Sequence, residues 1–169
     1  SPKELMSGQV DAGNDGGVDS FYCFLNDVLL DDTLEFDNRA GGTFEIKIIQ
    51  SKQGKGFSPT AIQKIERFLD DLLSVDREEA DYVYEYHGEL LTLVRLFKTA
   101  FKELLKRSVP KINIEVFCIS KLDVNEPGEN AARAAKKLVE RAQTYYTETS
   151  TQPVQFVGAR RLWSQLQVS

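Results

Sequence analysis

A chain of 169 residues, of which 41% are hydrophobic and 28% charged, is long enough to form a single domain with a sizeable core. Its net charge of −5 argues against a protein that coats nucleic acid by bulk electrostatics, although it permits an enzyme with a local basic groove. One histidine and two cysteines without a CxxC pair argue against a zinc site, and no apolar run approaches the roughly 20 residues that span a bilayer, so we expect no membrane partner.

The beginning of the chain predicts a loop that leads into the fold. Residues 1–10 have the pattern of the end of a helix, and residues 11–17 are rich in Gly, Asn and Asp, which predicts a turn or loop. The chain starts Ser-Pro-Lys and its single methionine is Met6. We therefore expect residues 1–169 to be one domain cut from a longer protein.

Two strands are expected next. Aromatic and β-branched residues predict a strand over 18–26, and residues 43–51 carry the clearest strand pattern in the chain. Residues 27–42 between them predict a hairpin connection of uncertain pairing, and residues 53–57 predict a flexible loop. Cys23 in the first strand and Cys118 further along the chain both fall inside strand-like apolar runs, which predicts buried free thiols and fits a reducing cytoplasmic compartment.

Two helices are expected in the middle of the chain. Ser58 as N-cap and Pro59 as first helical residue begin a helix. Its apolar stripe consists of Ile62, Ile65, Leu69 and Leu72. The second helix, over 89–107, is apolar around much of its circumference, which predicts a central buried helix, with a subunit interface as the alternative. Its polar line consists of Lys98, Lys102 and Lys106.

The last part of the chain alternates strand and helix. We expect a strand over 112–120, a loop over 125–130, a helix over 131–146, a strand over 154–157 and a short helix over 161–167. The helix over 131–146 would bury Ala135, Leu138 and Ala142 and expose Arg133, Lys137 and Arg141. With its strands and helices in this order, the chain is predicted to have an α/β fold.

Two short segments carry the chemistry. In residues 43–52, Gln50 and Lys52 point the same way because alternate residues of a strand share a face. If Asp19, which follows Gly16-Gly17-Val18, begins the neighbouring strand, a carboxylate, an amide oxygen and an ammonium converge at one sheet edge. Such a trio can hold a hard cation against a phosphate.

These segments resemble the PD-(D/E)xK, or restriction-endonuclease-like, nuclease superfamily. Asp19 matches its first acid, and Gln50-Ser51-Lys52 matches its acid-x-lysine motif with glutamine in place of the acid, as in Mrr-like endonucleases. Residues 14–22 (NDGGVDSFY) and 48–52 (IIQSK) are closest to the amino-terminal domain of abortive-infection phage-resistance (AIPR) proteins. The resemblance covers residues 11–75 and implies a mixed central sheet flanked by helices.

The resemblance also implies a mechanism. Asp19, the Gln50 amide and the Ser51 carbonyl would bind Mg²⁺ or Mn²⁺, and Lys52 would stabilise the charge that develops on the phosphate or the attacking water. The superfamily often adds a glutamate from the preceding helix, for which Glu4 is the candidate, with Asp11 and Asp15 as rivals.

The implied function is an endonuclease domain of a phage-defence protein in the bacterial cytoplasm. Its partners would be DNA or RNA, the remainder of the parent protein and, as an open alternative, a second copy in a homodimer. Asp19 could instead follow a tight turn, and Gln50 and Lys52 could be solvated residues at a strand end. The rival functions are a non-catalytic nucleic-acid-binding or sensing module on the same fold and an α/β interaction domain without either activity.

Several other side chains have simpler interpretations. His87 is expected to be a surface or packing histidine. The tyrosines at 82, 84 and 86 are expected to be partly buried rather than to stack on bases. The two cationic helix faces are expected to be solvated, with phosphate contact as the alternative.

Overall fold

The computed structural model describes residues 18–33, 41–52, 56–121, 126–161 and 164. The predicted helix end over 1–10 and loop over 11–17 lie outside these residues, as does Glu4 together with its rivals Asp11 and Asp15. The strands are β1 (Ser20–Leu25), β2 (Val28–Leu29), β3 (Thr43–Lys52), β4 (Lys111–Ser120), β5 (Thr149–Thr151) and β6 (Gln155–Val157). The helices are α2 (Pro59–Leu73), the short 3₁₀ helix η1 (Glu79–Asp81), α3 (Gly88–Leu105) and α4 (Glu129–Ala142).

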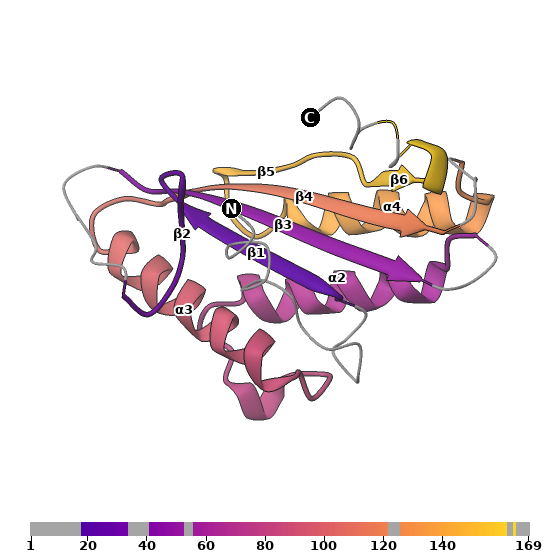
Figure 1. Ribbon diagram of the computed structural model, residues 1–169. Helices are drawn as coiled ribbons and strands as arrows, with labels where there is room; N and C mark the ends of the chain where they lie inside the picture. The colour runs from indigo at the N-terminus through magenta and orange to yellow at the C-terminus, as the bar shows by residue number, and fades with distance from the viewer. Residues whose placement is uncertain (1–17, 34–40, 53–55, 122–125, 162–163, 165–169) are drawn as a thin grey trace.

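The strands form one mixed sheet in the order β2-β1-β3-β4-β5 (Figure 1). β1 is antiparallel to β2 and β3, whereas β3 and β4 are parallel. β5 pairs with the first half of β4 and β6 with the second half, both parallel to it. The predicted α/β class with a mixed central sheet flanked by helices is therefore confirmed.

The core lies on one face of this sheet. Alternate residues of β3, such as Phe44, Ile46 and Ile48, are fully buried there, as the period of a strand requires. Helices α2, α3 and α4 supply the other half of the core: Phe68 of α2 meets Phe21 edge-to-face, and the α3 phenylalanines Phe97 and Phe101 pack on Phe44. In Figure 1, α2 and α4 lie side by side.

The local signals that begin elements act as expected. Ser58 caps α2, and its hydroxyl accepts a hydrogen bond from the N–H of Ala61 at 3.4 Å. Asn26 and Asp27 have φ angles of 50° and 68°, the left-handed values of a two-residue hairpin turn, so β1 turns directly into β2. The Asn26 side chain also accepts a hydrogen bond of 2.9 Å from the N–H of Thr43, which ties this turn to the start of β3.

The end of the chain differs from the prediction in two ways. α4 ends at Ala142 rather than at 146. Beyond its end, the Tyr146 hydroxyl donates a hydrogen bond of 2.7 Å to the carbonyl of Leu73, the last residue of α2. A short strand, β5, follows that no hydrophobic pattern announces. The backbone is helical at 159–161 and at 164, and the rest of the predicted last helix lies outside the described residues.

The long helix α3 is buried along one side only, so the prediction of a central buried helix is wrong: α3 flanks the sheet with one face in the core. Leu105 at its end is 40% exposed. No helix in the described ranges combines the length and the apolar character that crossing a membrane would require.

Candidate active site at the strand ends

One edge of the sheet gathers the residues of both motifs. The start of β1 meets the end of β3 there, because the two strands are antiparallel and Ser20 lies opposite Ile49. The N–H of Asp19 donates to the Ile49 carbonyl at 3.1 Å, so Asp19 lies directly before the paired part of β1. Figure 1 shows the arrowheads of β3 and β4 at this edge.

Asp19 is held against the backbone of β3. Its carboxylate oxygen Oδ2 accepts a hydrogen bond of 2.5 Å from the N–H of Ser51, and the side chain is half-buried. Burial raises the pKa of Asp19, and the hydrogen bond from Ser51 opposes part of that rise because it stabilises the carboxylate. Among the described residues the only hydrogen bond to this carboxylate is the one that Oδ2 accepts from Ser51.

Gln50 lies on the helix-covered face of the sheet. The residue is only 8% exposed, which excludes the interpretation of Gln50 as a solvated residue at a strand end. Within the described part of the chain its side-chain amide has no hydrogen-bond partner. Among the described residues the fully buried side-chain atoms without a hydrogen bond are the hydroxyl oxygens of Thr149 and Thr151, so the Gln50 amide is not fully enclosed.

Ser51 and Lys52, the remaining motif residues, differ in how far the structure describes them. Ser51 is exposed, and it reaches Asp19 through its backbone rather than its hydroxyl. The backbone of Lys52 pairs with Ser120 at the end of β4, but the Lys52 side chain lies outside the description, as does Glu4. The structure therefore brings Asp19 into contact with the backbone of Ser51. Gln50 directly precedes Ser51 in β3.

The donors at this edge are oxygens of mixed kind. No group of three or more His, Cys, Asp or Glu side chains suited to a metal occurs among the described residues. Metal binding here would therefore depend on the carboxylate of Asp19, the amide of Gln50 and the carbonyl of Ser51. Oxygen donors of this kind suit Mg²⁺ or Mn²⁺.

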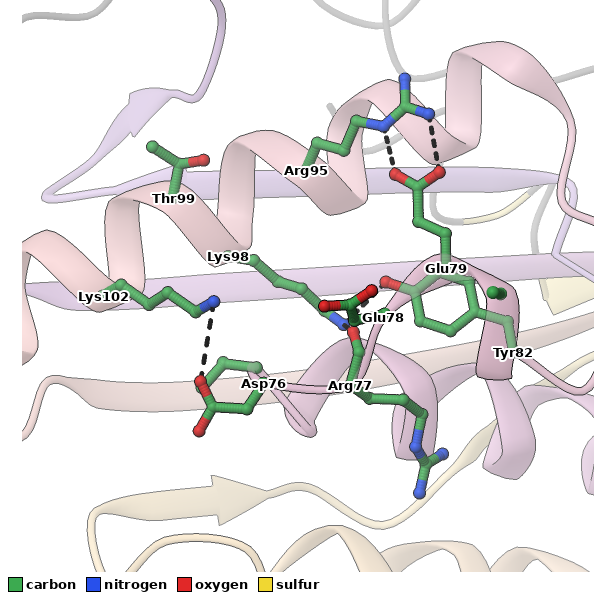
Figure 2. Close-up of a pocket in the computed structure, with 11 residues that line it drawn as sticks. Asp76, Arg77, Glu78, Glu79, Tyr82, Arg95, Lys98, Thr99 and Lys102 are labelled. Carbon is green, nitrogen blue, oxygen red and sulfur yellow. Dashed lines mark hydrogen bonds and ion pairs between the residues drawn. The ribbon is translucent and has the colours of Figure 1, made fainter.

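A separate cavity of about 500 Å³ lies between α3 and the η1 segment (Figure 2). Two pairs of its charged side chains interact: Arg95 binds Glu79 through two hydrogen bonds, and the Lys102 ammonium lies 3.6 Å from Asp76. The residues that line the cavity follow the last residue of α2 in the chain. The residues of the candidate site precede the first residue of α2. Since α2 has 15 residues, it separates the two by about 22 Å.

Lys98 in the wall of this cavity corrects a sequence prediction. Lys98 was expected to be solvated, but it is only 8% exposed, whereas Lys102 and Lys106 are exposed as expected. Its ammonium donates to the carbonyls of Ser74 and Arg77 at 3.1 and 3.0 Å.

The same ammonium also donates to the Tyr82 hydroxyl at 2.7 Å and lies 4.6 Å from the centre of the Tyr82 ring. Burial lowers the pKa of Lys98 to about 8. Lys98 therefore holds the segment after α2 against α3.

Sequence reasoning missed Asp71, which is 1% exposed in α2. Its carboxylate accepts hydrogen bonds from the Tyr86 hydroxyl at 2.5 Å and from Arg77 at 2.8 Å. The signal in the sequence was an acidic residue beside the apolar stripe of an amphipathic helix.

The prediction of partial burial is confirmed for the tyrosines, since Tyr86 is buried and both Tyr82 and Tyr84 are half-buried.

The other cations and the histidine have local partners. The Nδ1 atom of His87 accepts a hydrogen bond of 3.3 Å from the N–H of Glu89 and so caps α3. On α4, Arg133 pairs with Glu129 at 3.0 Å, and Arg141 pairs with Asp70 of α2 at 3.2 Å. The interpretation of this face as solvated therefore holds, with ion pairs along it.

Comparison with known proteins adds no relative: no family model, no curated protein and no solved structure matches this chain.

Proposed function

We propose that this domain is a metal-dependent nuclease of the PD-(D/E)xK class, which hydrolyses phosphodiester bonds in DNA. The observation that carries the proposal is the contact between the Asp19 carboxylate and the Ser51 backbone beside the buried amide of Gln50. Both motifs of the resemblance thus contribute to one small site at an open sheet edge. The biological setting that goes with this proposal is a phage-defence protein in the bacterial cytoplasm, of which this chain is the nuclease domain.

The described residues fit a hard divalent cation. Asp19 would supply one charged oxygen, and Gln50 and the Ser51 carbonyl would supply neutral ones. A bound Mg²⁺ or Mn²⁺ would lower the pKa of a coordinated water and offset the charge of the phosphate. The hydrogen bond from Ser51 fixes the direction of the Asp19 carboxylate before any ligand arrives.

Lys52 completes the proposed site. The motif places its ammonium on the same strand as Gln50, two residues further on, where a positive charge stabilises the negative charge that develops on the transferring phosphate. Asp19 and Gln50 would hold the cation, and Lys52 would act on the phosphate or the attacking water.

The test is cleavage of supercoiled and linear DNA in Mg²⁺ or Mn²⁺, with EDTA and an RNA substrate as parallel arms. We expect cleavage by the wild-type domain that is lost in Asp19→Asn and in Lys52→Ala. Lys47→Ala is the matched control, because Lys47 lies on the same strand but on the opposite face. Cleavage that persists in Asp19→Asn or Lys52→Ala would refute the assigned roles.

A non-catalytic nucleic-acid-binding module is the second candidate. The observation that favours it is the lack of a three-acid cluster in the described residues, which leaves Asp19 as the charged ligand. Calorimetric titration with Mn²⁺ separates the two functions. Site-specific binding that Asp19→Asn abolishes supports the nuclease, and DNA binding without metal binding supports the module.

A further inference from the structure

The strand order brings a second set of residues to the edge that holds Asp19. β3, β4 and β6 are parallel, with Gln50 opposite Cys118 and Cys118 opposite Phe156. The chain therefore leaves all three strands at the same edge of the sheet (Figure 1). Neighbouring strands lie about 4.8 Å apart, so β6 lies about 14 Å from β1 in the plane of the sheet.

Cations follow these strands. Lys121 comes directly after β4, and Arg160 and Arg161 come shortly after β6. All three side chains are exposed. Within the described part of the chain no acidic side chain forms an ion pair with Lys121.

The two arginines have a defined position. Arg161 donates a hydrogen bond of 3.4 Å to the carbonyl of Phe156 in β6, and the carbonyl of Arg160 accepts one of 3.0 Å from the Ser164 hydroxyl. An arginine presents five N–H donors, so Arg161 keeps donors for an external anion. The segment after β6 is thereby held beside the strand end.

We propose that Lys121, Arg160 and Arg161 form a phosphate-binding surface that guides a nucleic-acid strand past Asp19. This inference rests on the proposed function. It reconciles a net charge of −5 with a polyanionic substrate, because three exposed cations follow the strands that end at this edge although acidic residues predominate over the whole chain. Glu129 at the start of α4 forms an ion pair with Arg133 at 3.0 Å.

The experiment measures the binding of a fluorescein-labelled 20-nucleotide DNA, single- and double-stranded, by anisotropy in EDTA, where no cleavage occurs. The variants are Lys121→Glu and the double variant Arg160→Glu/Arg161→Glu. The matched controls are Lys111→Glu and Arg107→Glu, both exposed. Lys111 begins the strand that Lys121 follows and lies about 33 Å from it.

We expect each site variant to weaken binding by roughly three- to tenfold and to lower the slope of log K against log salt by about 1 per phosphate contact. The controls should change affinity by less than about twofold. Equal losses in Lys121→Glu and Lys111→Glu, unchanged affinity in the site variants, or no DNA binding by the wild-type protein would each overturn the proposal. Thermal melts of every variant identify any loss that comes from unfolding.

Failure of this surface and failure of the nuclease assignment give different results. A wild-type protein that cleaves DNA, with both site variants equal to it in binding, overturns the surface and leaves the nuclease. A wild-type protein that binds DNA through Lys121 but never cleaves supports the surface and overturns the nuclease.

Discussion

Asp19 and Ser51 lie 32 positions apart in the chain, yet the carboxylate of the first accepts a hydrogen bond of 2.5 Å from the backbone N–H of the second. This bond crosses from the start of β1 to the end of β3. It fixes a half-buried carboxylate that has no cationic partner in the described part of the chain. Such a group costs free energy in the absence of a ligand, as residues kept for function often do.

Asp19→Asn should therefore stabilise the protein, whether or not the proposed metal-dependent activity exists. Because burial raises the pKa of Asp19, the folded state binds the proton more tightly than the unfolded state, and wild-type stability falls as the pH rises through the folded pKa. The variant escapes this loss. We expect its melting temperature at pH 7 to exceed that of the wild type, and the difference to shrink as the pH falls toward about 4, where the unfolded carboxyl also binds the proton. Melting temperatures over this pH range provide the check; a variant that is less stable at neutral pH would contradict it.

Lys98→Met should destabilise the fold by on the order of 2 kcal/mol at pH 7, because the two carbonyls and the Tyr82 hydroxyl that Lys98 binds lose their partner. The deficit should grow with pH. The folded pKa of Lys98 is lowered to about 8, so the unfolded state holds more protons between that value and the ordinary lysine value of 10.5, and wild-type stability rises over this window.

Urea unfolding of the wild type and of Lys98→Met at pH 7 and pH 9 measures this change, and Lys102→Met is the exposed control on the same helix. A deficit that shrinks at pH 9 would show that Lys98 stabilises the fold chiefly through its charge.

Tyr86→Phe should cost about 1.5–3 kcal/mol, because it removes a buried hydrogen bond to the charged carboxylate of Asp71. Tyr84→Phe is the matched control: Tyr84 is half-buried, and its hydroxyl has no hydrogen bond within the described part of the chain. It should change the free energy of unfolding by less than about 0.5 kcal/mol. Chemical denaturation measures the free energy of unfolding of both variants. Equal losses in the two would refute the importance of the hydrogen bond to Asp71.

Gly42→Ala should cost about 1–2 kcal/mol, because a Cβ at this position would overlap the buried side chain of Leu104. Gly41→Ala tests the same substitution one residue earlier, where a Cβ meets no atom within 4 Å. We expect the second variant to be neutral within about 0.5 kcal/mol. Thermal denaturation compares the pair, and a neutral Gly42→Ala would mean that Leu104 moves aside freely.

The sequence was most informative where a residue's role depends on its near neighbours. Ser58 and Pro59 mark the start of α2 because capping acts within one turn, and alternation alone identifies β3. β5 was missed because its residues, Thr-Ser-Thr, have no apolar alternation and form a strand through pairing with β4.

The fate of individual polar side chains depended on distant parts of the chain. In the sequence, Lys98 is indistinguishable from Lys102, and only the folding of the segment 74–82 over α3 buries one of them. The end of α4 likewise depends on the contact of Tyr146 with Leu73, 73 positions away. At the candidate site, the approach of Asp19 to β3 followed from strand order, whereas the burial of Gln50 required the helices.

The antiparallel pairing of β1 and β3 has a practical consequence. The segment that joins these strands leaves β1 after Leu25 and enters β3 shortly before Phe44. Because Leu25 lies opposite Phe44, this connection lies at the end of the two strands that is opposite Asp19. Extra residues inserted at the exposed turn of Asn26 and Asp27 would leave the register between Ser20 and Ile49 unchanged. A fluorophore or an affinity tag attached there would therefore lie at the end of the sheet opposite the candidate site.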